Sequence, residues 1–380
     1  MPEMKNIENL ETPTLLLDLT VLENNIKTYQ QVADDYSKEL WPMIKTHKCT
    51  EIALLQQEAG AAGFLCGTLD ECEALIRAGI KNIMYAYPVV SEPNISRMLK
   101  IAKACNFVMR IDDLRQAKIL NEYALSSKMH LNYTIIINSG LNRFGIEPKY
   151  VMEFACKMQP FKNLIFKGIC THLGHVYGAS DYEGVISIAK EEMGVIKTAY
   201  NLLKNAGHNL EFVSSGSTPT FLEVAKNTDL NKLYPGNYVF MDNIQIALGV
   251  AKEQDCALTV LATVIANPRS GTYIIDAGSK CFGLDKGAHG GDGLVGYGLI
   301  KNYPELTLDR LSEEVGVITG REIALEIGEK IQIIPNHSCS AANMASYYIC
   351  KRGDFAVGSF RVDMRNNAKN KIYTTEGHKI

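Results

Sequence analysis

The sequence predicts an α/β protein: a (β/α)8 TIM barrel followed by a C-terminal antiparallel β domain that also takes the N-terminal strand. Two observations lead to this prediction. Short apolar runs alternate with amphipathic segments up to about residue 250, and beyond it strand-like runs alternate with Gly- and Asn-containing turns. We therefore assign residues 20–250 to the barrel and residues 1–19 and 251–380 to the β domain.

Eight apolar runs predict the barrel strands. They are apolar throughout, which is typical of parallel strands covered by helices. Segments between them, such as TEIALLQQEAG, carry apolar residues at three- and four-residue spacing and end on glycine, which predicts helices. A doubly wound open sheet has the same pattern and is the alternative. The predicted strands are residues 40–44, 64–67, 83–86, 107–111, 133–137, 166–170, 211–213 and 232–233.

The C-terminal third predicts β structure. ALTVLATVIANP, GTYIIDAGSK and DFAVGSFRVD are strand-like and are separated by turn residues. TPTLLLDL, near the N-terminus, is also strand-like, and we expect it to pair with this C-terminal sheet.

Composition narrows the class of protein. The hydrophobic content of 46% and charged content of 21% are those of a globular chain. A net charge of −3 gives no basic surface for nucleic acid, and no apolar run approaches the roughly 18 residues of a membrane span. The ten cysteines are scattered and mostly lie in apolar stretches, and the first residues contain no apolar signal region. These features predict a cytoplasmic enzyme.

WPMIKTHK places Lys45 at the carboxyl end of the first predicted strand, where barrel enzymes carry their chemistry. His47 and Lys48 follow within three residues, and crowded positive charge favours the neutral amine that a Schiff base requires. An ordinary lysine-rich surface loop explains the spacing equally well.

Two loops predict a phosphate site. SSGSTPT follows the seventh predicted strand and YPGNY the eighth, and these loops commonly bind phosphate in barrels. Gly216 lets backbone amides approach an anion, Ser217 and Thr218 offer hydroxyls, and a helix N-terminus adds its dipole. Helix capping is the alternative for SSGSTPT alone, but the two loops together favour phosphate binding.

THLGHVYG follows the sixth predicted strand and brings His172, His175 and Tyr177 to the barrel mouth. A histidine at this position is a candidate general base, and we predict that His175 has this role. Tyr177 is a candidate partner for a cofactor ring. Polar residues that merely line a loop are the alternative.

His337 and Cys339 lie two residues apart and so share one face if their segment is extended. Imidazole and thiolate are zinc ligands, and two protein ligands suit an open site. On spacing alone, chance proximity explains the pair better.

TPTLLLDLTVLENNI, PMIKTHK and AYPVV, in that order, resemble the D-serine dehydratase and D-threonine aldolase family. The resemblance spans about residues 12–365 and implies a pyridoxal 5′-phosphate (PLP) enzyme with an alanine-racemase barrel. It implies that Lys45 binds the PLP aldehyde and that Tyr177 contacts the ring. It also implies that Thr218, Gly236 and Asn237 contact the phosphate, and the loop argument above adds Ser217 to this predicted site.

IIPNHSCSAAN is similar to the Pro-Asn-His-x-Cys segment of the dehydratases, which implies Zn²⁺ on His337 and Cys339. The aldolases usually present His-x-Asp, which suits Mn²⁺, so Cys339 separates the two activities. The expected reaction is elimination of water from a D-3-hydroxyamino acid, with D-serine giving pyruvate and ammonia. The alternatives are a D-threonine aldolase and a racemase-like or non-catalytic PLP-binding protein. The resemblance also implies a homodimer.

The chain departs from the family pattern at four positions, one of which is Lys232, where an acidic residue is frequent. Asn138 stands where an aspartate is expected, Val315 where a histidine is typical, and Tyr234 where an arginine is frequent. Arg143 and Gly145 match the pattern, and Arg143 is a candidate for steering the substrate carboxylate or for holding the loop.

Overall fold

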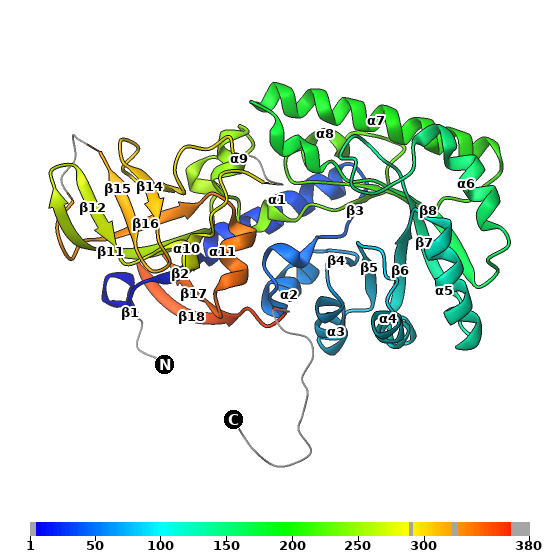
Figure 1. Ribbon diagram of the computed structural model, residues 1–380, viewed down its shortest axis with the longest axis horizontal. Coiled ribbons are helices and arrows are strands. Elements are labelled where there is room, and N and C mark those ends of the chain that lie inside the picture. Colours follow the sequence, from blue (N-terminus) through cyan, green and yellow to red (C-terminus); the bar gives the residue numbers. More distant parts are fainter. Residues whose placement is uncertain (1–4, 289–291, 321–324, 366–380) are drawn as a thin grey trace, which may run out of the picture.

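The computed structural model describes residues 5–288, 292–320 and 325–365. It contains an eight-stranded parallel sheet and a ten-stranded, mostly antiparallel sheet, which lie side by side (Figure 1). The predicted fold class is therefore confirmed. Residues 1–4, 289–291, 321–324 and 366–380, which the sequence analysis assigned to the β domain, lie outside the described residues.

All eight predicted barrel strands are present, in the order β3-β10-β9-β8-β7-β6-β5-β4. A parallel bridge between Met43 and Leu65 joins the two ends of this order, so the sheet closes and the open-sheet alternative is wrong. The strands are β3 (Glu39–Leu40), β4 (Phe64–Cys66), β5 (Asn82–Tyr85), β6 (Asn106–Ile111), β7 (Leu131–Ile136), β8 (Leu164–Cys170), β9 (Phe212–Ser215) and β10 (Lys232–Leu233).

The first strand is shorter than the predicted 40–44. It ends at Leu40, Pro42 follows without an amide hydrogen to donate, and Ile44–Thr46 forms the 3-10 turn η2. The residue at position 45 therefore leaves the barrel wall on a turn instead of extending a strand.

Helices surround the parallel sheet (Figure 1). Asp18, Thr68, Asp113 and Asp181 cap four of them by accepting hydrogen bonds from first-turn amides. The helices of the barrel are α1 (Leu19–Asp35), α2 (Thr50–Glu58), α3 (Leu69–Arg77), α4 (Glu92–Ala104), α5 (Leu114–Ser126), α6 (Val151–Met158), α7 (Tyr182–Asn205), α8 (Phe221–Ala225) and α9 (Asn243–Ala247).

The second sheet has the order β1-β18-β17-β2-β11-β12-β15-β14, and β16 pairs with β11 and β13. The N-terminal strand β2 pairs antiparallel with β11 and parallel with β17, the one parallel pair among the described strands of this sheet. The strands are β1 (Lys5–Asn6), β2 (Thr14–Asp18), β11 (Leu258–Arg269), β12 (Thr272–Ile275), β13 (Gly298–Ile300), β14 (Thr307–Leu311), β15 (Gly316–Thr319), β16 (Lys330–Pro335), β17 (Tyr347–Arg352) and β18 (Phe355–Arg361). Two short helices, α10 (Ser279–Phe282) and α11 (Ser338–Met344), lie beside it.

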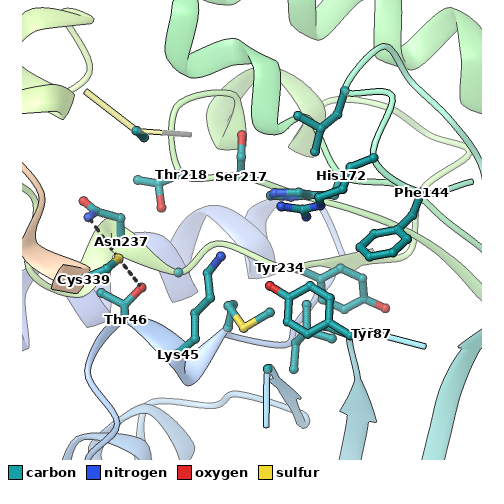
Figure 2. Close-up of a pocket in the computed structure, with 18 of the residues that line it drawn as sticks. Lys45, Thr46, Tyr87, Phe144, His172, Ser217, Thr218, Tyr234, Asn237 and Cys339 are labelled. Atoms are coloured by element: carbon teal, nitrogen blue, oxygen red, sulfur yellow. Dashed lines mark hydrogen bonds between the residues drawn. The ribbon is translucent and has the colours of Figure 1, made fainter. Parts of the chain in front are cut away.

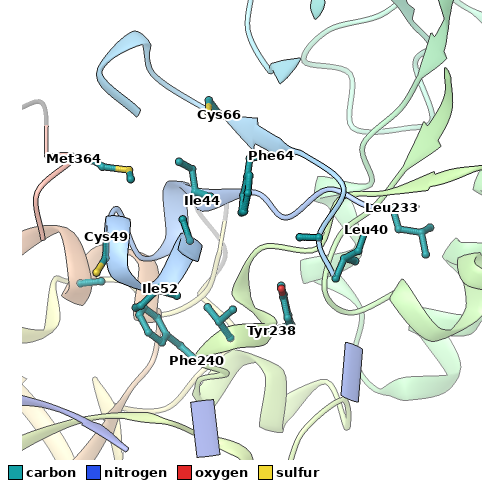
Figure 3. Packing of buried hydrophobic residues seen from close by; sticks show 14 of the residues in the cluster. Leu40, Ile44, Cys49, Ile52, Phe64, Cys66, Leu233, Tyr238, Phe240 and Met364 are labelled. Atoms are coloured by element: carbon teal, nitrogen blue, oxygen red, sulfur yellow. The ribbon is translucent and has the colours of Figure 1, made fainter. Parts of the chain in front are cut away.

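The segment after β3 is fixed by a core shared between the two sheets (Figure 3). Ile44, Ile52 and Phe240 are fully buried there, next to Met364 from the end of the described chain. The amide of Met364 donates to the carbonyl of Lys48 at 3.0 Å, and the hydroxyl of Tyr348 donates to the carbonyl of His47 at 2.5 Å. The β domain thus holds the turn that carries Lys45.

Across the described ranges, every helix is too short or too polar to cross a membrane.

Candidate active site

A cavity of about 470 Å³ opens at the carboxyl ends of the barrel strands. Its walls come from the turn η2, from the loops after β7, β8, β9 and β10, and from α11 of the β domain (Figure 2). All eight residues that the sequence analysis assigned to cofactor or metal contact line it, namely Lys45, Tyr177, Ser217, Thr218, Gly236, Asn237, His337 and Cys339.

All eight therefore meet in one cavity, although they come from both ends of the chain.

Lys45 extends from η2 with its amine directed into the cavity (Figure 2). The neighbouring Lys48 is paired instead, since its Nζ lies 2.5 Å from the buried Oε1 of Glu71. Within the described chain no ion pair joins Lys45 to a carboxylate. Burial lowers the pKa of His47 to about 3, so that ring is neutral. The crowding by two cations that the sequence analysis invoked is therefore wrong, and Lys45 is distinguished by its position.

The loop after β9 forms one side of the cavity. Gly216 has φ +156°, and a Cβ there would lie 2.6 Å from the amide nitrogen of Tyr234, so a side chain does not fit. Ser217 and Thr218 follow, both buried, and both line the cavity. The helix after them, α8, has only five residues, so the hydroxyls and amides of the loop would contribute more to binding an anion here than the predicted helix dipole.

The loop after β10 lines the same cavity as the loop after β9. A Cβ on Gly236 would lie 3.2 Å from both the carbonyl of Met43 and Oγ1 of Thr46, so this loop packs tightly against η2. Asn237 donates through Nδ2 to Asp242 at 2.7 Å and to Ser338 at 2.8 Å. Its Oδ1 is buried and has no hydrogen-bond partner within the described residues. Tight backbone, hydroxyls and a reactive amine within one cavity fit a small aldehyde with an anionic tail, which is the chemistry of PLP.

Of the two histidines after β8, His172 lines the cavity. Its Nδ1 lies 3.0 Å from the carbonyl oxygen of Gly216, which can only accept, so Nδ1 carries the hydrogen. Burial, with added repulsion from Lys45, lowers the pKa of His172 to about 3. His175 is not among the described residues that line the cavity. Its ring packs against Gly140 instead, and a Cβ added to Gly140 would lie 2.9 Å from Cε1 of His175. The structure therefore favours His172 over the predicted His175.

Arg110 is a lining residue that the sequence analysis missed. It lies on β6, is 5% exposed, and stacks over the ring of Tyr234 with 5.0 Å from Cζ to the ring centroid. Its Nη2 has no hydrogen-bond partner in the described part of the chain. Val108 and Arg110 are two apart on a strand and so point to the same side, into the barrel. A charged residue at an inward strand position was the signal available in the sequence.

His337 and Cys339 enter the cavity from the β domain. His337 is extended, but helix α11 begins at Ser338, so the pair meets at a helix start and not along an extended segment. Sγ of Cys339 lies 3.4 Å from Oγ1 of Thr46, and Nδ1 of His337 lies 3.8 Å from Oδ2 of Asp285. Burial alone would raise the pKa of the Cys339 thiol, but the positive charges of His337 and Lys45 outweigh it and lower the pKa.

A thiolate beside an imidazole is a donor set that suits zinc. Among the described residues, no group of three or more His, Cys, Asp or Glu side chains is arranged to hold a metal ion. The two side chains therefore fit an open, two-residue site and not a closed structural one.

Comparisons with known proteins agree with this fold. Residues 17–244 match the family model of the alanine racemase N-terminal domain, and residues 257–351 match that of a putative serine dehydratase domain. D-serine dehydratase of Dictyostelium discoideum is 29% identical over 392 residues, which cover 94% of this chain and 97% of that protein.

Two solved structures are similar over almost the whole chain. D-threonine aldolase from Filomicrobium marinum is 27% identical with a TM-score of 0.88, covering 96% of this chain and 98% of the other. D-threo-3-hydroxyaspartate dehydratase from Delftia sp. HT23 is 26% identical with a TM-score of 0.86, covering 94% and 98%. A D-threo-3-hydroxyaspartate dehydratase was also solved as a cysteine-to-alanine mutant in a metal-free form.

Proposed function

The chain belongs to the alanine racemase N-terminal domain family, and from this premise we propose that it is a PLP-dependent lyase that eliminates water from a D-3-hydroxyamino acid. We propose D-serine as the substrate, with pyruvate and ammonia as products. The similarity to D-serine dehydratase over 94% of the chain supports the reaction class, as does the match to a putative serine dehydratase domain.

The observation that carries the proposal is the meeting of Lys45 with the loops after β9 and β10 in one cavity. Lys45 offers the amine that would hold the cofactor aldehyde. Ser217, Thr218 and the tight backbone at Gly236 would hold its phosphate, and Tyr177 lies within reach of the same cavity. When bound, PLP supplies an electron sink for the charge left at the substrate α-carbon.

The side chains of this chain then divide the remaining work. Nζ of Lys45 would accept the α-hydrogen of the substrate as a proton. Arg143 at the rim and Arg110 at the floor give the cavity positive charge for a substrate carboxylate. His172 stays neutral and holds the carbonyl of Gly216 in place.

His337 and Cys339 would hold a zinc ion at the side of the cavity nearest Asn237. Zinc there would act as a Lewis acid toward the substrate hydroxyl, which is a poor leaving group as hydroxide. Treating the pure protein with a chelator is expected to abolish pyruvate formation, and added zinc to restore it. Turnover that is unchanged by chelation would contradict the metal role.

A D-threonine aldolase is the second candidate, because a solved aldolase matches the chain as well as a solved dehydratase does. Retro-aldol cleavage would give glycine and an aldehyde, and in that case Mn²⁺ would be the expected metal. Incubation with D-serine and with D-threonine separates the two functions. Pyruvate from D-serine without glycine supports elimination, and glycine as the main product from D-threonine contradicts it.

The cofactor assignment is tested by the Lys45→Ala variant. We expect the wild-type protein to show the visible absorbance of PLP bound to a lysine, and the variant to lose it. Lys27→Ala, at an exposed position of α1, is the matched control and should keep the absorbance. A Lys45→Ala protein that still shows the absorbance would remove the cofactor assignment, and a wild-type protein without it would favour a function outside PLP chemistry.

We also propose that the chain forms a homodimer in the cytoplasm. β17 and β18 expose Tyr347, Phe355 and Val357 on one hairpin, which supports a contact with another chain. Light scattering coupled to gel filtration tests this, and a mass near the 42.1 kDa of one chain would contradict the dimer.

A further inference from the structure

Glu192 is a carboxylic side chain on the apolar face of α7. It is fully buried, in register with Ala189 and Ile196. Its Oε1 accepts a short hydrogen bond from the hydroxyl of Ser215, and its Oε2 is buried with no hydrogen-bond partner in the described chain. Because an unsatisfied buried carboxyl oxygen costs free energy, packing alone does not explain a glutamate at this position.

Ser215 is the last residue of β9 and directly precedes the Gly216–Thr218 loop of the cavity. The carbonyl of Ser215 accepts from the amide of Tyr234 at 2.9 Å. The carbonyl of Gly216 is held by His172 at 3.0 Å. The backbone of this loop is thus tied on two sides, and the carboxyl of Glu192 ties the side chain of Ser215 from behind.

We propose that Glu192 is a positioning residue which, in its protonated form, holds the Ser215 end of the loop that receives the cofactor phosphate. This inference rests on the proposed PLP function. A neutral carboxyl fixes the loop without opposing the phosphate, whereas an ionised one would place a negative charge directly behind a site for a dianion.

The surroundings support the protonated form at neutral pH. Burial raises the pKa of Glu192 to about 8, and the hydroxyl of Ser215 opposes that shift only in part. Besides β9, which carries Ser215, the elements that pack against α7 include α6, α8, η3 (Pro148–Tyr150) and η4 (Gly174–Gly178). None of their titratable side chains moves the pKa of Glu192, namely Lys149, Tyr150, Glu153, Cys156, Lys157, His175, Tyr177 and Glu223.

His172 and Tyr234, whose ring and amide contact the backbone of this loop, stay neutral over the same range. The pKa of His172 is about 3, so the ring is uncharged well below neutral pH. Burial raises the pKa of Tyr234 above its usual value, so the phenol keeps its hydrogen. A loss of affinity that begins near pH 8 for PLP, and not for the form of the cofactor without its phosphate, therefore points to Glu192.

The test measures the dissociation constants of PLP and of pyridoxal, which lacks the phosphate, from about pH 6.5 to about pH 9.5. The proteins are wild type, Glu192→Gln, and the control Glu191→Gln, which removes an exposed carboxylate one residue away. For PLP, the ratio of wild-type to Glu192→Gln dissociation constants should be constant up to about pH 8 and then rise, by at most about tenfold per pH unit. For pyridoxal the ratio should stay flat, and Glu191→Gln should follow wild type.

A flat ratio for PLP, in a protein that binds PLP through Lys45, would overturn the role of Glu192 and leave the proposed function intact. Equal rises for PLP and pyridoxal would also overturn it, because the effect would then not act on the phosphate. If Glu192→Gln does not fold, the wild-type profiles decide, since PLP but not pyridoxal must weaken above about pH 8. A wild-type protein that binds neither compound overturns both proposals.

Discussion

The buried ion pair between Lys48 and Glu71 fastens the turn that carries Lys45, and replacing Glu71 by glutamine tests its contribution. Glu71 is fully buried, and its Oε1 lies 2.5 Å from Nζ of Lys48. Its Oε2 accepts from the amides of Gly67 at 2.6 Å and Thr68 at 3.3 Å. Glutamine keeps an oxygen for these amides and has nearly the same volume, so the substitution removes mainly the charge.

Breaking a buried ion pair on one side costs about 3–5 kcal/mol, because the remaining charge is left without its partner. The Lys48 side chain is 11% exposed, so water reaches it slightly, and we expect about 3 kcal/mol for Glu71→Gln. Lys48→Met leaves a carboxylate that still has two amide donors, and about 2–3 kcal/mol is expected. The double variant should cost less than the sum by at least about 1.5 kcal/mol, because no unpaired charge remains.

Urea unfolding followed by circular dichroism measures these costs as shifts of the transition midpoint. The matched control is the pair Lys157 and Glu153 on α6, which has the same 2.5 Å distance but side chains that are more than half exposed. Removing its glutamate charge should change stability by less than about 0.5 kcal/mol. Equal midpoint shifts for Glu71→Gln and Glu153→Gln would refute the reasoning, as would strictly additive effects of the two single variants.

Three further variants test the same structure. Gly216→Ala should weaken PLP binding by about tenfold or more in an absorbance titration, because a Cβ would clash with the amide of Tyr234 at 2.6 Å. Gly194→Ala, on helix α7, should stabilise the fold by about 0.5–1 kcal/mol, because a Cβ at Gly194 would meet no described atom within 4 Å. Glu192→Gln should stabilise the fold against urea at pH 8 more than at pH 5, by up to about 3 kcal/mol. The sign follows because the pKa of Glu192 rises from 4.5 to about 8 on folding, so the wild type loses stability as pH rises between those values.

The barrel was predictable because its strands are covered on both faces and are therefore apolar runs, each separated by a helical period. The boundary of β3 was not, because the strand stops at Leu40 while the apolar pattern continues to Ile44. The parallel pairing of β2 with β17 also escaped prediction. This pairing depends on which strands lie next to β2 in the second sheet. The alternation of apolar and polar residues within one segment does not say which strands those are.

Part of the candidate site could also be predicted from the sequence, and part could not. Lys45 and the loops at Gly216 and Gly236 were found because residues after parallel strands gather at one end of the barrel. The choice between His172 and His175 was not available, since the 3-10 turn η4 begins between them and rotates successive side chains away from one another. Only the cavity lining decides between the two rings.

Arg110 and Glu192 were missed for a common reason. Each lies in register with apolar residues of its own element, Arg110 with Val108 on β6 and Glu192 with Ala189 on α7, so each was absorbed into an apolar pattern. A charged group on a buried face destabilises the fold unless something compensates for it. Both groups carry a buried atom without a partner, and both lie at the cavity or directly behind its wall. A charged residue in register with a buried face is therefore a signal for function in this fold, because the compensation has to come from the occupant of the site or from the proton that the group keeps.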